Sequence, residues 1–218
     1  MEHTSKRGQI KSKNTGAFHY INCDVGFVCN GCHTIYFECS ISYMQGTDQK
    51  QHRLILMRHG KADWESNVAS DFNRPLTPRG EKDISCMGRW LKDQGLMPDQ
   101  FISSPAPRAI RSAHLVAKEL GIKELDVMPI EALYNASQTD LLDVLEQHMY
   151  GAETLLLIGH NPGLENLLYY LTELKNDGDQ YVKSMATSTI AVLNYGAAPI
   201  NTRQHASILE VLMMPEEL

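Results

Sequence analysis

Two histidines and two arginines of this sequence each lie in or just after a short apolar run. They are Arg58, His59, Arg108 and His160. A guanidinium group presents a planar set of donors that matches the oxygens of a phosphate. An imidazole titrates near neutral pH, so one ring can be a neutral nucleophile while another donates a proton. These residue types together predict a site for a tetrahedral anion with two negative charges.

The segments around these residues also predict the starts of helices. Arg58 and His59 end the stretch LILMRH, Arg108 ends SSPAPR at 103–108, and His160 lies within GHNPG at 159–163. The prolines in the last two segments favour the first turn of a helix. Unpaired N–H groups and the positive end of the helix dipole attract anions there. Each motif alone arises by chance, but three at strand ends favour one shared site.

The order of the predicted elements indicates where the three motifs meet. Strands are predicted at 53–57, 101–103, 125–128, 154–158, 190–193 and 208–212, and helices begin at Thr77-Pro78, Ser104-Pro105, Ser137 and Asn161-Pro162. This alternation is typical of an α/β fold, a three-layer α/β/α sandwich around a mostly parallel sheet. The last two strands have little helix between them, so one of them is expected to be antiparallel. Parallel sheets bind ligands beyond the carboxyl ends of their strands, so the motifs are expected to converge at that edge.

Length and composition predict one main domain with an appendage. The 218 residues are 43% hydrophobic, enough for one sizeable core. A net charge of −6 argues against nucleic-acid or anionic-membrane partners. No apolar run has membrane-spanning length and no clean signal peptide is visible, so a cytoplasmic location is predicted. Residues 1–50 are expected to form a poorly ordered extension, and residues 51–218 the functional domain.

Four of the five cysteines lie in this extension, at Cys23, Cys29, Cys32 and Cys39. They contain a single C-x-x-C pair, whereas a four-cysteine zinc site usually has two. Neither zinc nor a disulfide framework is therefore expected. No metal or other cofactor is expected at the histidines either, because the neighbouring arginines would repel a cation. Translation from Met44 would make residues 1–43 a leader.

The motifs RHG, SSPxxRA and GHNPG together resemble those of the histidine phosphatase superfamily, which has the phosphoglycerate mutase-like fold. The stretches SDFNRPLTPRG at 70–80 and GHNPGLE at 159–165 are similar to SixA-type phosphohistidine phosphatases, and the likeness extends over about residues 52–213. The resemblance implies that His59 is the nucleophile and that it becomes a transient phosphohistidine. It implies that the phosphoryl group is bound by Arg58, Arg108 and His160. The supporting positions are Gly60, Asp71, Arg74 and Asn161.

The sequence departs from this family at one position. Many relatives carry a glutamate general acid in a Leu-x-Glu pattern, where this chain has Leu133-Tyr134-Asn135. An amide cannot protonate an alkoxide leaving group, whereas the leaving nitrogen of a phosphoramidate can itself be protonated. The departure therefore favours phosphohistidine as the substrate. Asp71 and Glu131 are alternative proton donors, and an ion pair with Arg74 is the structural alternative for Asp71.

The connection between Gly121 and Ser137 is too short for a lid, so the pocket is expected to be open, with residues 61–76 at its rim. An open pocket suits a phosphorylated side chain on another protein. The predicted function is hydrolysis of phosphohistidine on a protein, such as a phosphotransfer domain. Two alternatives are a phosphatase of small phosphate compounds and a phosphate-binding module without catalysis. A mutase is disfavoured by the missing acid and lid.

Overall fold

The computed structural model describes residues 8–11, 18–23, 39–40, 50–64, 70–174 and 185–218. The chain divides into two units, Met1–Asp48 and Gln49–Leu218. In the first unit, β2 (Phe18–Cys23) pairs antiparallel with both β1 (Gly8–Lys11) and β3 (Cys39–Ser40). Cys29 and Cys32 lie outside the described residues. The expectation of a poorly ordered extension over residues 1–50 stays a prediction.

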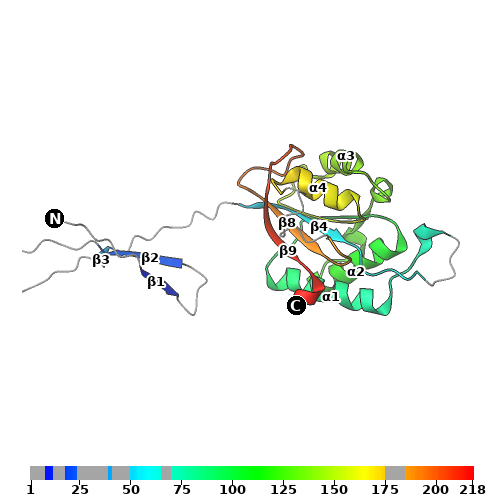
Figure 1. The fold of residues 1–218 in the computed structure, drawn as a ribbon, viewed down its shortest axis with the longest axis horizontal. Helices are drawn as coiled ribbons and strands as arrows, with labels where there is room; N and C mark the ends of the chain where they lie inside the picture. The colour runs from blue at the N-terminus through cyan, green and yellow to red at the C-terminus, as the bar shows by residue number, and fades with distance from the viewer. Residues whose placement is uncertain (1–7, 12–17, 24–38, 41–49, 65–69, 175–184) are drawn as a thin grey trace, which may run out of the picture. The chain divides into compact units, whose positions relative to one another are not determined.

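The described residues of the second unit form a sheet of six strands in the order β6-β5-β7-β4-β8-β9 (Figure 1). The strands are β4 (His52–Arg58), β5 (Gln100–Ser103), β6 (Met128–Pro129), β7 (Thr154–Gly159), β8 (Ile190–Gly196) and β9 (Ile208–Met213). The pairs β5–β6, β5–β7 and β4–β7 are parallel, whereas β8 is antiparallel to both β4 and β9. One strand thus runs against the others, as predicted.

Helices cover both faces of this sheet (Figure 1). They are α1 (Pro78–Asp93), α2 (Pro107–Leu120), α3 (Gln138–His148) and α4 (Gly163–Leu171). Successive side chains of a strand point to opposite faces, so β4 contributes to both hydrophobic layers. Leu54 and Leu56 pack in the layer with α3 and α4, while Ile55 and Met57 pack with α1 and α2. The predicted three-layer α/β/α architecture is confirmed.

Two predicted helix starts are confirmed in detail. Thr77 caps α1, since its hydroxyl oxygen accepts a hydrogen bond from the Gly80 N–H at 3.0 Å. Ser137 and Asp140 form a reciprocal capping box at the start of α3. Such caps satisfy backbone donors that have no partner inside the helix.

Two predicted boundaries were wrong. The second helix begins at Pro107 and not at Ser104-Pro105, because the residue before a proline avoids helical angles; Ala106 is extended, with ψ 135°. The strand predicted at 125–128 is reduced to β6. Leu125 instead lies in a 3-10 turn, η2 (Glu124–Asp126), with 94% of its surface exposed. Of residues 125–128 only Val127 is buried, so this segment has no buried face that would support a longer strand.

The fold brings the end of β4 directly against the start of α1. A Cβ atom on Gly60 would lie 2.8 Å from the Gly80 carbonyl oxygen, and one on Gly80 would lie 2.4 Å from the Lys61 oxygen. Only glycine permits so close a backbone approach at both positions. The segment after β4 is thereby fixed beside the carboxyl ends of β5 and β7. None of the helices in the described part of the chain has the length and apolarity needed to cross a bilayer.

Candidate active site

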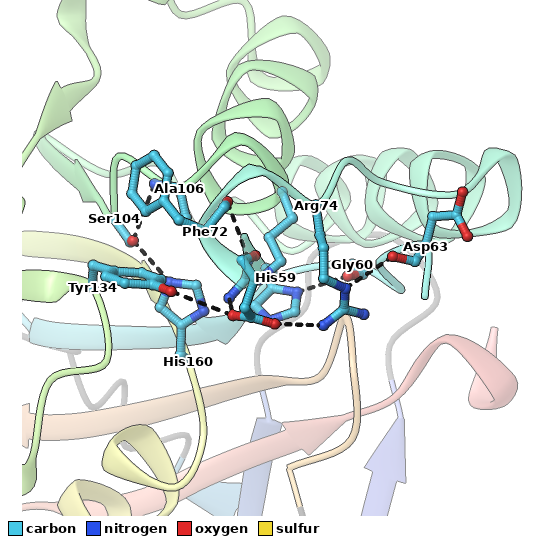
Figure 2. Close-up of polar contacts among 11 residues, drawn as sticks. His59, Gly60, Asp63, Phe72, Arg74, Ser104, Ala106, Tyr134 and His160 are labelled. Carbon is cyan, nitrogen blue, oxygen red and sulfur yellow. Dashed lines mark hydrogen bonds and ion pairs between the residues drawn. The ribbon is translucent and has the colours of Figure 1, made fainter. Parts of the chain in front are cut away.

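A cavity of about 470 Å³ lies beyond the carboxyl ends of β4, β5 and β7. Every site residue predicted from the sequence lines it except Gly60, whose carbonyl oxygen instead contacts His59. The predicted residues that line the cavity are Arg58, His59, Asp71, Arg74, Arg108, His160 and Asn161. Figure 2 shows the two histidine rings beside each other, with Arg74 next to His59. The three motifs therefore converge as the topology predicted.

His59 is held as a neutral imidazole with a free ring nitrogen. Its Nδ1 lies 2.7 Å from the Gly60 carbonyl oxygen. A carbonyl only accepts hydrogen bonds, so Nδ1 carries the proton and Nε2 keeps its lone pair. Burial is the largest cause that lowers the pKa of His59 to about 4, and the charges of Arg108, Arg58 and Arg74 lower it further against the opposing effect of the Gly60 hydrogen bond. At neutral pH the ring is uncharged, as a nucleophile requires.

His160 lies next to His59, with 4.9 Å between the ring centroids. Burial, followed by the neighbouring His59 and Arg108, lowers the pKa of His160 to about 3. Its Nε2 is 2.8 Å from the hydroxyl oxygen of Ser104, which also accepts the Ala106 N–H at 3.3 Å. Figure 2 shows the second ring nitrogen on the side of His59.

We predict one tautomer for His160 from its contact with Ser104. The Ser104 hydroxyl can donate to Nε2 of His160 or accept from it; because its oxygen already accepts the Ala106 N–H, we expect it to donate its own hydrogen to Nε2. A neutral imidazole has one N–H, and that proton then lies on Nδ1. The ring can therefore donate a hydrogen bond into the cavity without being charged. Ser104, which is fully buried, acts as a positioning residue.

Replacement of this hydroxyl tests the assignment. Ser104→Ala is expected to lower kcat about tenfold with little change in KM, because His160 loses the donor that fixes its tautomer. The ¹⁵N shifts of the His160 ring should move toward the other tautomer. Ser103→Ala is the matched control, since Ser103 is equally buried but donates only to the Ser104 carbonyl oxygen. Unchanged kcat and ring shifts in Ser104→Ala would show that Ser104 has no such role.

Three guanidinium groups surround the histidines, and each is held by the backbone. Arg58 Nη1 donates to the Met185 carbonyl oxygen at 2.9 Å, and Arg74 Nε donates to that of Asp63 at 2.9 Å. Arg108, 96% buried, donates from Nη1 to the Asp71 carbonyl oxygen at 2.7 Å. The buried Nε of Arg58 has no partner among the described residues.

Asp71 forms ion pairs with two of these arginines. Its carboxylate accepts from Arg74 Nη1 at 2.8 Å and from Arg108 Nη2 at 2.9 Å, and Tyr134 donates its hydroxyl at 3.3 Å. The hydrogen bond from Arg74 is the largest cause that lowers the pKa of Asp71. The predicted ion pair with Arg74 is therefore present, and the carboxylate has no proton to donate in this arrangement. Glu131, the other candidate acid, is not among the cavity-lining residues, whereas Asn135 is.

The backbone contacts that fix this site were not predicted. The Ser188 N–H is shared between the carbonyl oxygens of Arg58 and His59, at 3.2 and 3.1 Å. Ser188 is buried and has a φ of +67°, an uncommon conformation for a serine. The Asn161 amide nitrogen donates to Met185 at 3.0 Å and to Glu165 at 3.1 Å. No sequence pattern marks the contacts of Ser188 and Met185, which join segments more than 20 residues apart, whereas Asn161 and Glu165 are four residues apart.

One protein-family model matches part of this chain. A family model described as the histidine phosphatase superfamily (branch 1) matches residues 54–137. An uncharacterized chloroplastic protein of Arabidopsis thaliana is 28% identical over 121 residues, which are 52% of this chain and 56% of that protein. An uncharacterized protein of Mycobacterium tuberculosis is 30% identical over 142 residues, which are 63% of this chain and 85% of that protein.

Solved structures are similar over most of the second unit. The crystal structure of SixA from Agrobacterium tumefaciens has a TM-score of 0.63 and 26% identity, covering 75% of this chain and 98% of that one. A tungstate complex of the protein histidine phosphatase SixA has a TM-score of 0.59 and 23% identity, covering 76% and 98%. These structures share the fold described above.

Proposed function

Because the chain belongs to the histidine phosphatase superfamily, we propose that it hydrolyses phosphohistidine on a protein through a phosphohistidine formed at His59. The observation that supports this proposal is that the neutral ring of His59, with its unprotonated Nε2, shares one cavity with Arg58, Arg108 and His160. Both the sequence motifs and the arrangement of these side chains therefore support phosphoryl transfer.

In the first displacement, Nε2 of His59 attacks the phosphorus atom of the substrate. The substrate imidazole binds already protonated at its other ring nitrogen, so that when the bond between phosphorus and the substrate nitrogen breaks, as the bond to Nε2 forms, it leaves as a neutral imidazole. Arg58 and Arg108 bind the equatorial oxygens, and His160 donates its N–H to them. Such fixed donors stabilise the charge of the transition state without rearranging.

In the second displacement, water attacks the phosphorus atom of phosphorylated His59. The bond to Nε2 breaks, inorganic phosphate leaves with the oxygen of that water, and His59 returns to its neutral form. The Gly60 carbonyl oxygen keeps the Nδ1 proton in place throughout.

Two features support phosphohistidine over a phosphomonoester. Asn135, an amide, lines the cavity, and Asp71 is held ionised by two arginines, so neither supplies a proton to an alkoxide. Residues 121–137, all of them described, contain only η2, β6 and the single turn η3 (Glu131–Leu133) between α2 and α3, and add no lid helix. A phosphotransfer domain is the proposed kind of partner. A cytoplasmic location stays a prediction.

A comparison of substrates tests this function. We expect kcat/KM for a phosphohistidine-bearing protein to exceed that for sugar phosphates by at least about 100-fold, the usual contribution of a general acid. Release of inorganic phosphate would be followed for both, after subtraction of the uncatalysed rate. Comparable rates on both substrates would instead favour a phosphatase of small compounds. Tight phosphate binding with no turnover of either would favour a binding module.

A further inference from the structure

An exposed tryptophan stands at the edge of the cavity. Trp64 lines the cavity while 80% of its surface is exposed. The other exposed large apolar side chains of the described residues, including Leu125, Tyr150 and Ile208, do not line it. An exposed tryptophan beside a charged pocket has a large apolar area available for a partner, and tryptophan is enriched where binding energy concentrates at interfaces.

Trp64 contacts the same arginine that borders the phosphoryl site. The Arg74 guanidinium carbon lies 3.3 Å from the centroid of the Trp64 ring, in a cation–π contact. Arg74 is 91% buried and is hydrogen-bonded to Asp63 and Asp71. One face of the indole is therefore fixed against Arg74, and the rest of the side chain faces solvent. A preorganised aromatic surface loses little conformational entropy on binding.

A lysine without a partner extends this surface. Lys61 lines the same cavity and is exposed, and within the described part of the chain its ammonium group has no hydrogen-bonded or ion-paired partner. By contrast, Arg79 on the adjacent first turn of α1 lies 3.6 Å from Asp83 and 3.9 Å from Glu216. Lys61 is thus a cation at the cavity mouth that can pair with a charge on a partner.

We propose that Trp64 and Lys61 form a docking ledge for the protein that carries the phosphohistidine. Apolar surface next to the phosphohistidine packs on the indole of Trp64, and a carboxylate of that protein pairs with Lys61. This inference rests on the proposed function. A small phosphoramidate is bound by the arginines and histidines around His59, so we expect the ledge to contribute mainly to the binding of a protein substrate. Charge complementarity at Lys61 also favours the encounter with an acidic partner surface.

Kinetics on two substrates test the role of Trp64. Trp64→Ala is expected to raise KM for a phosphohistidine-bearing protein by about 10- to 30-fold, as is usual for loss of an interfacial hot spot. The kcat value for that protein, and kcat/KM for phosphoramidate, should stay within about twofold of wild type. Trp64→Phe should keep most of the protein affinity. Tyr150→Ala is the matched control, because Tyr150 is 94% exposed and lies outside the cavity lining.

A second variant tests the charge. Lys61→Ala is expected to raise KM for the protein substrate about three- to fivefold at low salt and to weaken its dependence on ionic strength. If Trp64→Ala lowered kcat/KM equally for both substrates, Trp64 would only hold Arg74 in place. If KM for the protein were unchanged, Trp64 would have no role in docking. Either result would overturn the proposed docking ledge. If wild type failed to hydrolyse the protein substrate at all, the proposed function would fail instead.

Discussion

His59→Ala is expected to lose turnover by about 10⁴- to 10⁶-fold, the range found when the nucleophile of a covalent mechanism is removed. Alanine has no nitrogen to attack phosphorus, and the second histidine cannot replace it, because Nε2 of His160 is engaged by Ser104. The measurement is a quench of the enzyme with labelled phosphohistidine substrate. Wild type should keep a label that is stable in base and lost in acid, and His59→Ala should keep none.

Two further measurements make this result specific. His59→Ala should still bind inorganic phosphate, because Arg58 and Arg108 remain in place with their own backbone partners. His205→Ala, at an exposed histidine outside the cavity lining, should label like wild type. A labelled His59→Ala enzyme, or a label that survives acid, would contradict a phosphohistidine at this position.

Much of the fold could be predicted because the central strands are continuous apolar runs. In β4, the run from Leu54 to Met57 is buried on both faces, which is typical of a central strand with helices on each side. The caps Thr77 and Ser137 have specific hydrogen-bonding roles, so they could be located from local sequence alone. The edge strand β6 could not, because its two residues depend on pairing with β5 rather than on their own pattern.

The candidate site was predictable where side chains follow strands, and not where the backbone carries the contact. Arg58, His59, Arg108 and His160 belong to three motifs that the topology places at one sheet edge. Ser188 and the Met185 carbonyl oxygen fix two of them by contacts that depend on the folded course of the backbone before β8. Ser104 falls in a predicted motif, but its contact with His160 depends on the tertiary structure. It is therefore easier to predict from the sequence which groups react than to predict which groups orient them.

The amide at Asn135 is the residue whose replacement should change substrate preference most. Asn135 lines the cavity and has a φ of +51°, a conformation that asparagine and aspartate adopt more readily than other side chains. A glutamate would adopt this backbone conformation less readily than an aspartate. Asn135→Asp therefore introduces a carboxylic acid with the least change in conformation.

Asn135→Asp is expected to raise the hydrolysis of an alkyl phosphate such as glycerol phosphate by about 100-fold over wild type. The gain should be near zero for p-nitrophenyl phosphate, whose leaving group needs no proton, and for phosphohistidine. It should grow as the pH falls, since only the protonated carboxyl donates. Asn135→Ala, which removes the amide without adding an acid, should show no gain.

The comparison between leaving groups of different basicity decides whether the residue at position 135 supplies the proton. Suppose that the hydrolysis rates of Asn135→Asp and Asn135→Ala depend on the basicity of the leaving group in the same way. A proton must then reach the alkoxide from another residue. Asp71 becomes the first candidate, once phosphate displaces its carboxylate from Arg108. The missing acid would then no longer favour phosphohistidine. If only the aspartate variant gains, the amide at this position is the physical reason that phosphomonoesters are poor substrates. Preference for a nitrogen leaving group would then follow from one side chain at the cavity wall.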